Sequence, residues 1–165
     1  MKKKILAAIL AVMMVLGALA CAAAESATAP KIKTATCLND GTIPTVTMEY
    51  SDPENRTWIE VYLLKEGDAQ PNMGTIEVGG KTYSVVGIQT IDPDDPSAYS
   101  LLDDGTVSLK TDLYFGNCPV PEPGDDLFLT VGLTAEGSEE ELGELIPITI
   151  PQSGEAFTNG PEAVE

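Results

Sequence analysis

The chain has 165 residues, with nine lysines and arginines against 26 aspartates and glutamates, a net charge of −17 and no histidine. Its acidity argues against binding to nucleic acid or to anionic lipid, because like charges repel and phosphate groups are contacted mainly by lysine and arginine. Without histidine, Ser-His-Asp and Cys-His nucleophilic systems are excluded, and ordinary zinc and copper sites lose their usual ligand.

The first expected element in the chain is an export signal, residues 1–24. Lysines at positions 2–4 precede a run of apolar residues and Gly17, and the run ends in small residues. This is the layout of a bacterial secretory signal peptide, and about 16 apolar residues are few for a membrane span. We therefore expect an exported protein, secreted or at the cell surface, with no membrane span in its mature form. A retained anchor helix is the alternative.

The processing of this signal has two alternatives. Small residues allow cleavage after Ala20 or after Ala24, and we favour Ala24. Residues 16–21 also resemble a lipobox, in which Cys21 would be lipidated and become the mature N-terminus. Either route carries the chain out of the cytoplasm. Without residues 1–24 the chain keeps all 26 acidic residues and six basic ones, so its net charge is −20.

After a short polar linker, residues 25–30, the pattern is typical of β-strands. Runs rich in valine, isoleucine, threonine and aromatic residues alternate with clusters of glycine, proline, asparagine and aspartate. The expected strands are residues 31–37, 45–50, 57–64, 74–78, 81–88, 106–110, 127–134 and 144–150. Several alternate apolar with polar residues, as antiparallel strands with one buried face do. The tail, residues 152–165, is small and polar and is expected to be disordered.

Turn residues connect these expected strands. The pair Gly79-Gly80 accepts the positive φ that a two-residue hairpin requires. Asn39-Asp40-Gly41 and Asp103-Asp104-Gly105 are also typical turns. Seven or eight short strands at regular spacing predict one domain, residues 31–151, with an all-β fold, an antiparallel β-sandwich.

In this order of elements the chain resembles the immunoglobulin and fibronectin type III modules of bacterial exported proteins. The resemblance lies in the mid-domain strand, residues 58–63, and in the closing hairpin of residues 127–134 with 144–150. It covers residues 31–151 and concerns architecture, since no diagnostic motif is shared. It implies a non-catalytic role in binding, adhesion or spacing, with an unidentified protein or glycan as partner.

Two cysteines, Cys37 and Cys118, lie beyond the expected signal. An even pair in an oxidising compartment predicts a disulfide. On the chain-entropy model, closing so long a loop contributes about 4–5 kcal/mol to stability. The alternative is a pair of buried free thiols.

Aspartates gather in two segments that are close in the sequence. They are Asp92, Asp94 and Asp95, followed by Asp103 and Asp104. A loop that folds back would bring both groups together, and carboxylates are preferred ligands of Ca²⁺. A calcium site that stabilises the domain is therefore one hypothesis, and solvated turn residues are the alternative. We expect no other cofactor.

Trp58, Glu60 and Tyr62 alternate along one expected strand, so their side chains share one face. If the opposite face is core, two aromatic rings flank a carboxylate on the outer face, which suits contact with a carbohydrate or a peptide. The alternative is that this face is itself covered. A calcium-stabilised carbohydrate-binding module is thus the second functional hypothesis. A hydrolase with two catalytic carboxylates is the third, and we expect no enzymatic activity.

Overall fold

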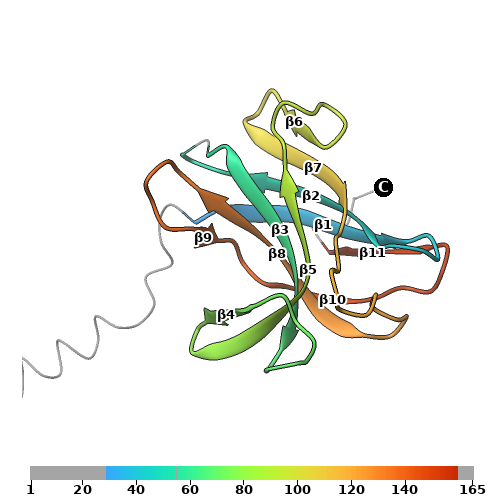
Figure 1. Cartoon of the computed structure of the whole chain (residues 1–165). Coiled ribbons are helices and arrows are strands. Elements are labelled where there is room, and N and C mark those ends of the chain that lie inside the picture. The colour runs from blue at the N-terminus through green and yellow to red at the C-terminus, as the bar shows by residue number, and fades with distance from the viewer. Residues whose placement is uncertain (1–28, 55, 160–165) are drawn as a thin grey trace, which may run out of the picture.

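Antiparallel strands in two sheets account for the regular structure of the computed structural model, which describes residues 29–54 and 56–159 (Figure 1). The expected signal with Cys21 lies outside the described residues. The strands are β1 (Lys31–Asn39), β2 (Thr45–Ser51), β3 (Trp58–Glu66), β4 (Thr75–Val78), β5 (Lys81–Ile91), β6 (Tyr99–Leu101), β7 (Thr106–Asp112), β8 (Asp126–Thr134), β9 (Glu141–Leu142), β10 (Ile146–Thr149) and β11 (Glu155–Asn159). Among the described residues, no helix is long and apolar enough to cross a membrane.

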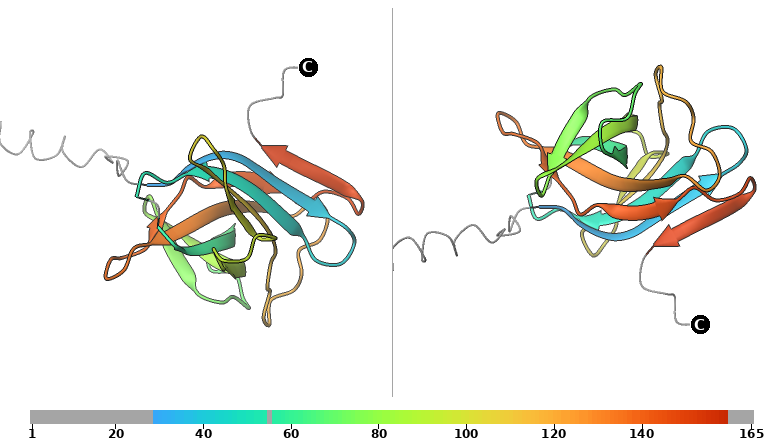
Figure 2. Two further views of the ribbon diagram at one scale, coloured as in Figure 1. Left: turned by 90° about the horizontal axis from the view of Figure 1, so that it is seen from above. Right: turned by 90° about the horizontal axis from the view of Figure 1, so that it is seen from below.

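The two sheets form a sandwich, which confirms the expected fold class. One sheet has the order β11-β1-β2-β7-β6, and the other has the order β10-β8-β3-β5-β4 with β9 beside β8. Figure 2 shows the two layers of strands from above and from below. The expected closing hairpin is present, because β8 pairs with β10. The Gly79-Gly80 turn joins β4 to β5 with φ values of 59° and 77°, which is the positive φ that this turn needs.

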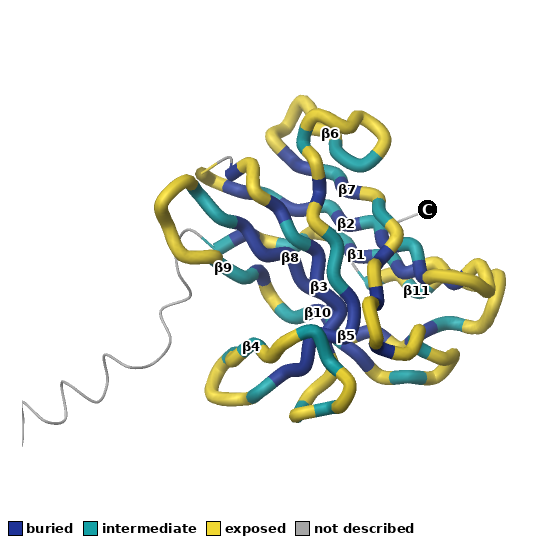
Figure 3. The backbone as a smooth tube through the Cα atoms, viewed as in Figure 1, coloured by how far each residue is buried: buried dark blue, intermediate teal, exposed yellow. Residues whose placement is uncertain are grey.

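The main core lies between the sheets and is built by alternation along the central strands (Figure 3). Residues that point inward are fully buried, while their neighbours in sequence point outward. The largest fully buried side chains include Met48, Tyr50, Ile59, Leu63, Leu129 and Leu133. Burying one such aliphatic side chain contributes about 1.5–3 kcal/mol, so this inter-sheet cluster supplies much of the stability.

The central strand β3 buries residues on both of its faces. Ile59, Val61 and Leu63 point into the main core and are 0 % exposed. On the outer face, Tyr62 and Leu64 join a second apolar cluster with Tyr83 and Val85 from β5, against which partly buried side chains of β4 pack. The outer face of the six-stranded sheet is therefore covered at this end of β3 and open at the Trp58 end.

The C-terminal strand corrects the expected disordered tail and the expected domain end at residue 151. Residues 155–159 form β11, which pairs with β1 at the edge of the five-stranded sheet. Phe157, the one aromatic residue of this tail, lies opposite Cys37 and packs against the main core. One apolar anchor and a free sheet edge thus order a segment whose composition is otherwise polar.

Candidate functional site

The Trp58 end of β3 combines an exposed ring with a carboxylate on the outer face. Trp58 is 58 % exposed, although its neighbour Ile59 is fully buried. Glu60 follows on the same face and is half-buried. On β5, Thr90 lies opposite Glu60, and its hydroxyl donates to the Glu60 carboxylate over 3.2 Å. The alternation along this strand predicted that Trp58, Glu60 and Tyr62 share one face. In the structure, Trp58 and Glu60 lie at the surface of that face.

Tyr62 differs from the expectation that it contributes an exposed ring. Its side chain is only 6 % exposed because the ring packs into the second apolar cluster. Its hydroxyl lies 2.7 Å from Oε2 of Glu60 and 2.7 Å from Oε1 of Glu140. Tyr62 therefore positions two carboxyl groups, and its ring is not available for contact with a ligand.

Glu140 is the member of this site that the sequence did not indicate. It lies in the connection between β8 and β9, 78 positions from Tyr62 in the sequence. Its carboxyl group sits over Gly132, where an added Cβ would lie 2.1 Å from Glu140 Oε1 and 2.8 Å from the Tyr62 ring. A glycine inside a strand costs stability and often marks a close approach. Gly132 within β8 was the only local signal of this contact.

The electrostatics of the three groups follow from burial and from their contacts. Burial raises the pKa of Tyr62, and its contacts with Glu140 and Glu60 raise it further, so the phenol keeps its proton. Burial is also the largest cause of the raised pKa of Glu140. The Tyr62 hydroxyl lowers that pKa, whereas the charge of Glu60 and its contact with the Glu140 carboxyl raise it.

Tyr114 adds a second exposed aromatic ring to the same sheet face. Its backbone exchanges two hydrogen bonds of 2.9 Å with Ile88 of β5. Directly paired residues of antiparallel strands point to the same side, so Tyr114 shares the outer face with Ile88 and Tyr62. The ring is 64 % exposed. An isolated tyrosine in a loop gave no sequence signal for this position.

The five candidate calcium ligands are turn residues in the structure. Asp92 accepts a hydrogen bond from the backbone of Asp94, and Asp95 accepts two from Ser97, which lower the pKa of Asp95. In the second group, Asp103 is exposed and Asp104 accepts a hydrogen bond from the backbone of Thr106.

The pKa of Asp104 is lowered to about 2, chiefly by the hydrogen bonds from Thr106 and then by Lys33. Across residues 29–54 and 56–159, no three acidic or cysteine side chains are grouped so that they could hold a metal ion. The structure therefore does not bring the two groups of aspartates together. Their side chains satisfy the backbone of their own turns, as aspartate commonly does.

The expected disulfide is not formed: Cys37 and Cys118 are both free and buried. Cys37 points from β1 into the main core, where burial raises the pKa of its thiol to about 11. Cys118 lies in the segment after β7, with Sγ 3.5 Å from the carbonyl oxygen of Pro71. The fold thus places the two thiols in different surroundings. The disulfide was predicted from the even number of cysteines, which gives no information about where each thiol lies in the fold.

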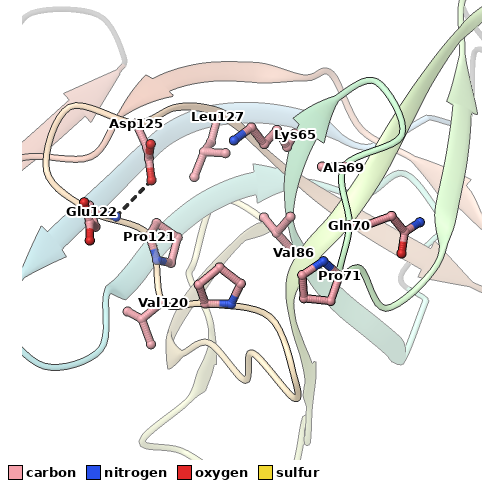
Figure 4. Close-up of a pocket in the computed structure, with 11 residues that line it drawn as sticks. Lys65, Ala69, Gln70, Pro71, Val86, Val120, Pro121, Glu122, Asp125 and Leu127 are labelled. Carbon is pink, nitrogen blue, oxygen red and sulfur yellow. Dashed lines mark hydrogen bonds between the residues drawn. The ribbon is translucent and has the colours of Figure 1, made fainter.

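A cavity of about 270 Å³ lies between the segments that follow β3 and β7 (Figure 4). Its lining comprises Lys65, Ala69, Gln70, Pro71, Val86, Pro119, Val120, Pro121, Glu122, Asp125 and Leu127. Asp125 is already engaged, because its carboxylate accepts a 2.9 Å hydrogen bond from the backbone of Glu122. The volume is below the usual range of small-molecule sites, so the outer face of the six-stranded sheet is the stronger candidate.

A comparison with models of known protein families found no match, and a comparison with curated proteins found none either. A sandwich fold alone does not specify a function. The candidate site therefore rests on its own geometry: the exposed Trp58 ring and the Glu60 carboxylate on one sheet face, with the exposed Tyr114 ring farther along that face.

Proposed function

We propose that this protein is an exported, non-catalytic β-sandwich module that binds a neutral or positively charged glycan through the Trp58 surface. This surface is formed by Trp58, Glu60 and Thr90, with Tyr114 farther along the same sheet face. The observation that carries the proposal is the 58 % exposure of Trp58 on a regular strand whose next residue is fully buried. An exposed large ring beside polar groups is typical of interaction sites.

The chemistry of the surface favours a sugar. The apolar C–H face of a pyranose ring can pack on the indole, and its hydroxyl groups can bond to the Glu60 carboxylate and the Thr90 hydroxyl. Two residues along a strand span about 7 Å, so one sugar residue can reach both Trp58 and Glu60. The net charge of −20 expected for residues 25–165 disfavours acidic glycans.

The arrangement of the carboxyl groups supports binding without catalysis. A glycosidase needs two carboxyl groups on either side of the bond that is cleaved. Here the Tyr62 hydroxyl lies 2.7 Å from Glu60 and 2.7 Å from Glu140, and it occupies the space between them. A glycosidic oxygen therefore has no place between these two carboxyl groups.

The proposal is tested on an array of neutral, amino and acidic glycans with the intact protein and two variants. We expect Trp58→Ala to weaken binding at least tenfold. Leu101→Ala is the matched control, because Leu101 is also 58 % exposed but lies on β6 in the other sheet. Absence of binding to every glycan, or equal binding by Trp58→Ala and the unchanged protein, would overturn the proposal.

A further inference from the structure

The contact of Tyr62 with Glu60 and Glu140 requires a proton in addition to that of the phenol. Both carboxylate oxygens lie 2.7 Å from the same hydroxyl, which has one hydrogen to donate. The Tyr62 hydroxyl can therefore donate to one carboxylate only. The second contact is a hydrogen bond only if that carboxyl group is protonated and donates to the phenol oxygen.

The sheet leaves room for the Glu140 carboxyl group at Gly132. Gly132 pairs with Glu60 on one side and with Leu142 of β9 on the other, and its missing side chain leaves the space that the Glu140 carboxyl fills. An alanine at this position would meet both Glu140 and the Tyr62 ring. Glu140 thus lies in a notch of the sheet, close to the partner with which it shares the proton.

We propose that Glu60 and Glu140 hold one proton between them through Tyr62, and that loss of this proton as the pH rises releases the connection between β8 and β9 from the sheet. Once both carboxyl groups are charged, one of them faces a phenol oxygen that has no hydrogen left to donate. Repulsion between the two charges then drives Glu140 out of the Gly132 notch.

The charged groups near Glu140 come from three elements. Glu60 on β3 contacts the Glu140 carboxyl and raises its pKa. From β5 the neighbour of Glu60 is the uncharged Thr90. The next carboxylate, Glu141, is bound by Arg56 over 2.9 Å. The released Glu140 therefore moves toward solvent, where the exposed remainder of its side chain already lies.

Release stays local because β9 is held by other contacts. Arg56 holds Glu141, and the backbone of Gly143 donates a 2.8 Å hydrogen bond to Val131. The freed segment is residues 135–140, whose internal contact is a turn from Ser138 to Ala135. If the proposed glycan site is correct, release also opens the notch beside Glu60 and makes binding at the Trp58 surface pH-dependent.

The test is a titration of the intact protein from pH 3 to 9 by carboxyl and backbone nuclear magnetic resonance. We expect Glu140 to lose its proton above its ordinary pKa of 4.5. The amides of Gly132 and residues 135–140 should shift in the same step.

Three variants sharpen the test. Glu140→Gln should keep the closed arrangement at every pH, because a glutamine amide can donate to Glu60 and accept from Tyr62. Tyr62→Phe should raise the pKa of Glu140 further from its ordinary value, because the Tyr62 hydroxyl lowers that pKa in the unchanged protein. Glu139→Gln removes the same charge from the neighbouring exposed position and should leave the titration of Glu140 unchanged.

The proposal is overturned if Glu140 loses its proton at its ordinary pKa of 4.5, or if residues 135–140 are unaffected by that step. These readings need no ligand, so they stand even if the protein binds no glycan. Conversely, equal binding of a glycan at pH 4 and pH 8 would support the proposed function. It would also show that this proton does not control glycan binding.

Discussion

Arg56 and Asp52, four positions apart, form an ion pair of 2.8 Å in which both side chains are almost fully buried, 3 % and 2 % exposed. The Arg56 guanidinium also donates to Glu141 over 2.9 Å. It therefore ties the turn before β3 to the start of β9. A buried charge is tolerated only with its partners in place, so this pair should be sensitive to the removal of one partner.

We predict that Asp52→Ala lowers the free energy of unfolding by about 3–5 kcal/mol, because it leaves the buried Arg56 charge without its main partner. Urea unfolding monitored by circular dichroism measures this loss. The control is Glu66→Ala, which breaks the exposed 3.0 Å pair of Lys81 with Glu66 and should change stability by less than about 1 kcal/mol. Similar losses for both variants would contradict the prediction.

The shared proton predicts a pH-dependent difference between the unchanged protein and Glu140→Gln. The pKa of Glu140 is raised in the fold from its ordinary 4.5, so its contribution to stability is fully present below pH 4.5 and is lost as the pH rises through the raised pKa. Glutamine stays neutral and loses nothing. We expect the melting temperatures to agree near pH 4 and the variant to melt higher at pH 8. A constant difference between the two proteins would argue against the raised pKa.

The buried thiol of Cys37 predicts slow alkylation in the folded protein. Burial raises its pKa from 9.0 to about 11, so at pH 8 little thiolate is present and the thiol is shielded. Alkylation at Cys37, followed by mass spectrometry of its peptide, should become fast only in urea. The thiol's contribution to stability should be present below pH 9 and lost between pH 9 and about 11. A Cys37 that stays unmodified in urea without reductant would instead indicate a disulfide.

The packing of β11 predicts that Phe157→Ala destabilises the domain by about 2 kcal/mol. Phe157 is half-buried against the main core, and a fully buried phenylalanine costs about 3–5 kcal/mol when it is truncated to alanine. Thr158→Ala is the control. Thr158 is exposed, and its hydroxyl contacts that of Thr36 at 3.1 Å, so its loss should be under about 1 kcal/mol. Equal effects would mean that Phe157 is not the anchor of β11.

The fold was largely predictable because local alternation in the sequence matches the burial of long strands. Each of the eight expected strands overlaps an observed one. The structure adds β6, β9 and β11, which have three, two and five residues. β6 and β9 are too short to show a periodicity, and β11 lies in a segment that is polar apart from Phe157. All three pair with strands of an existing sheet, which offers them backbone partners.

The candidate site was predictable only in part, because half of it depends on contacts between distant segments. The period of two in β3 correctly placed Trp58 and Glu60 on one face. Tyr62 was expected at the surface, but the outer apolar cluster, which includes Tyr83 of β5, covers its ring. Glu140 reaches the site from 78 positions away, and no spacing rule connects it with Tyr62.

The pairing of β1 with β11 determines how the domain responds to a pulling force. The strands are antiparallel, and Asn159 lies opposite Ala35 in the middle of β1, so the C-terminal end of β11 faces the half of β1 that begins at Lys31. Tension applied between Lys31 and Asn159 therefore pulls the two strands apart from one end. It breaks the backbone hydrogen bonds between them one pair after another, beginning with the pair of Asn159 and Ala35. In a domain tethered at both ends, β11 would peel away first, while the sandwich between β2 and β10 would bear little of the load.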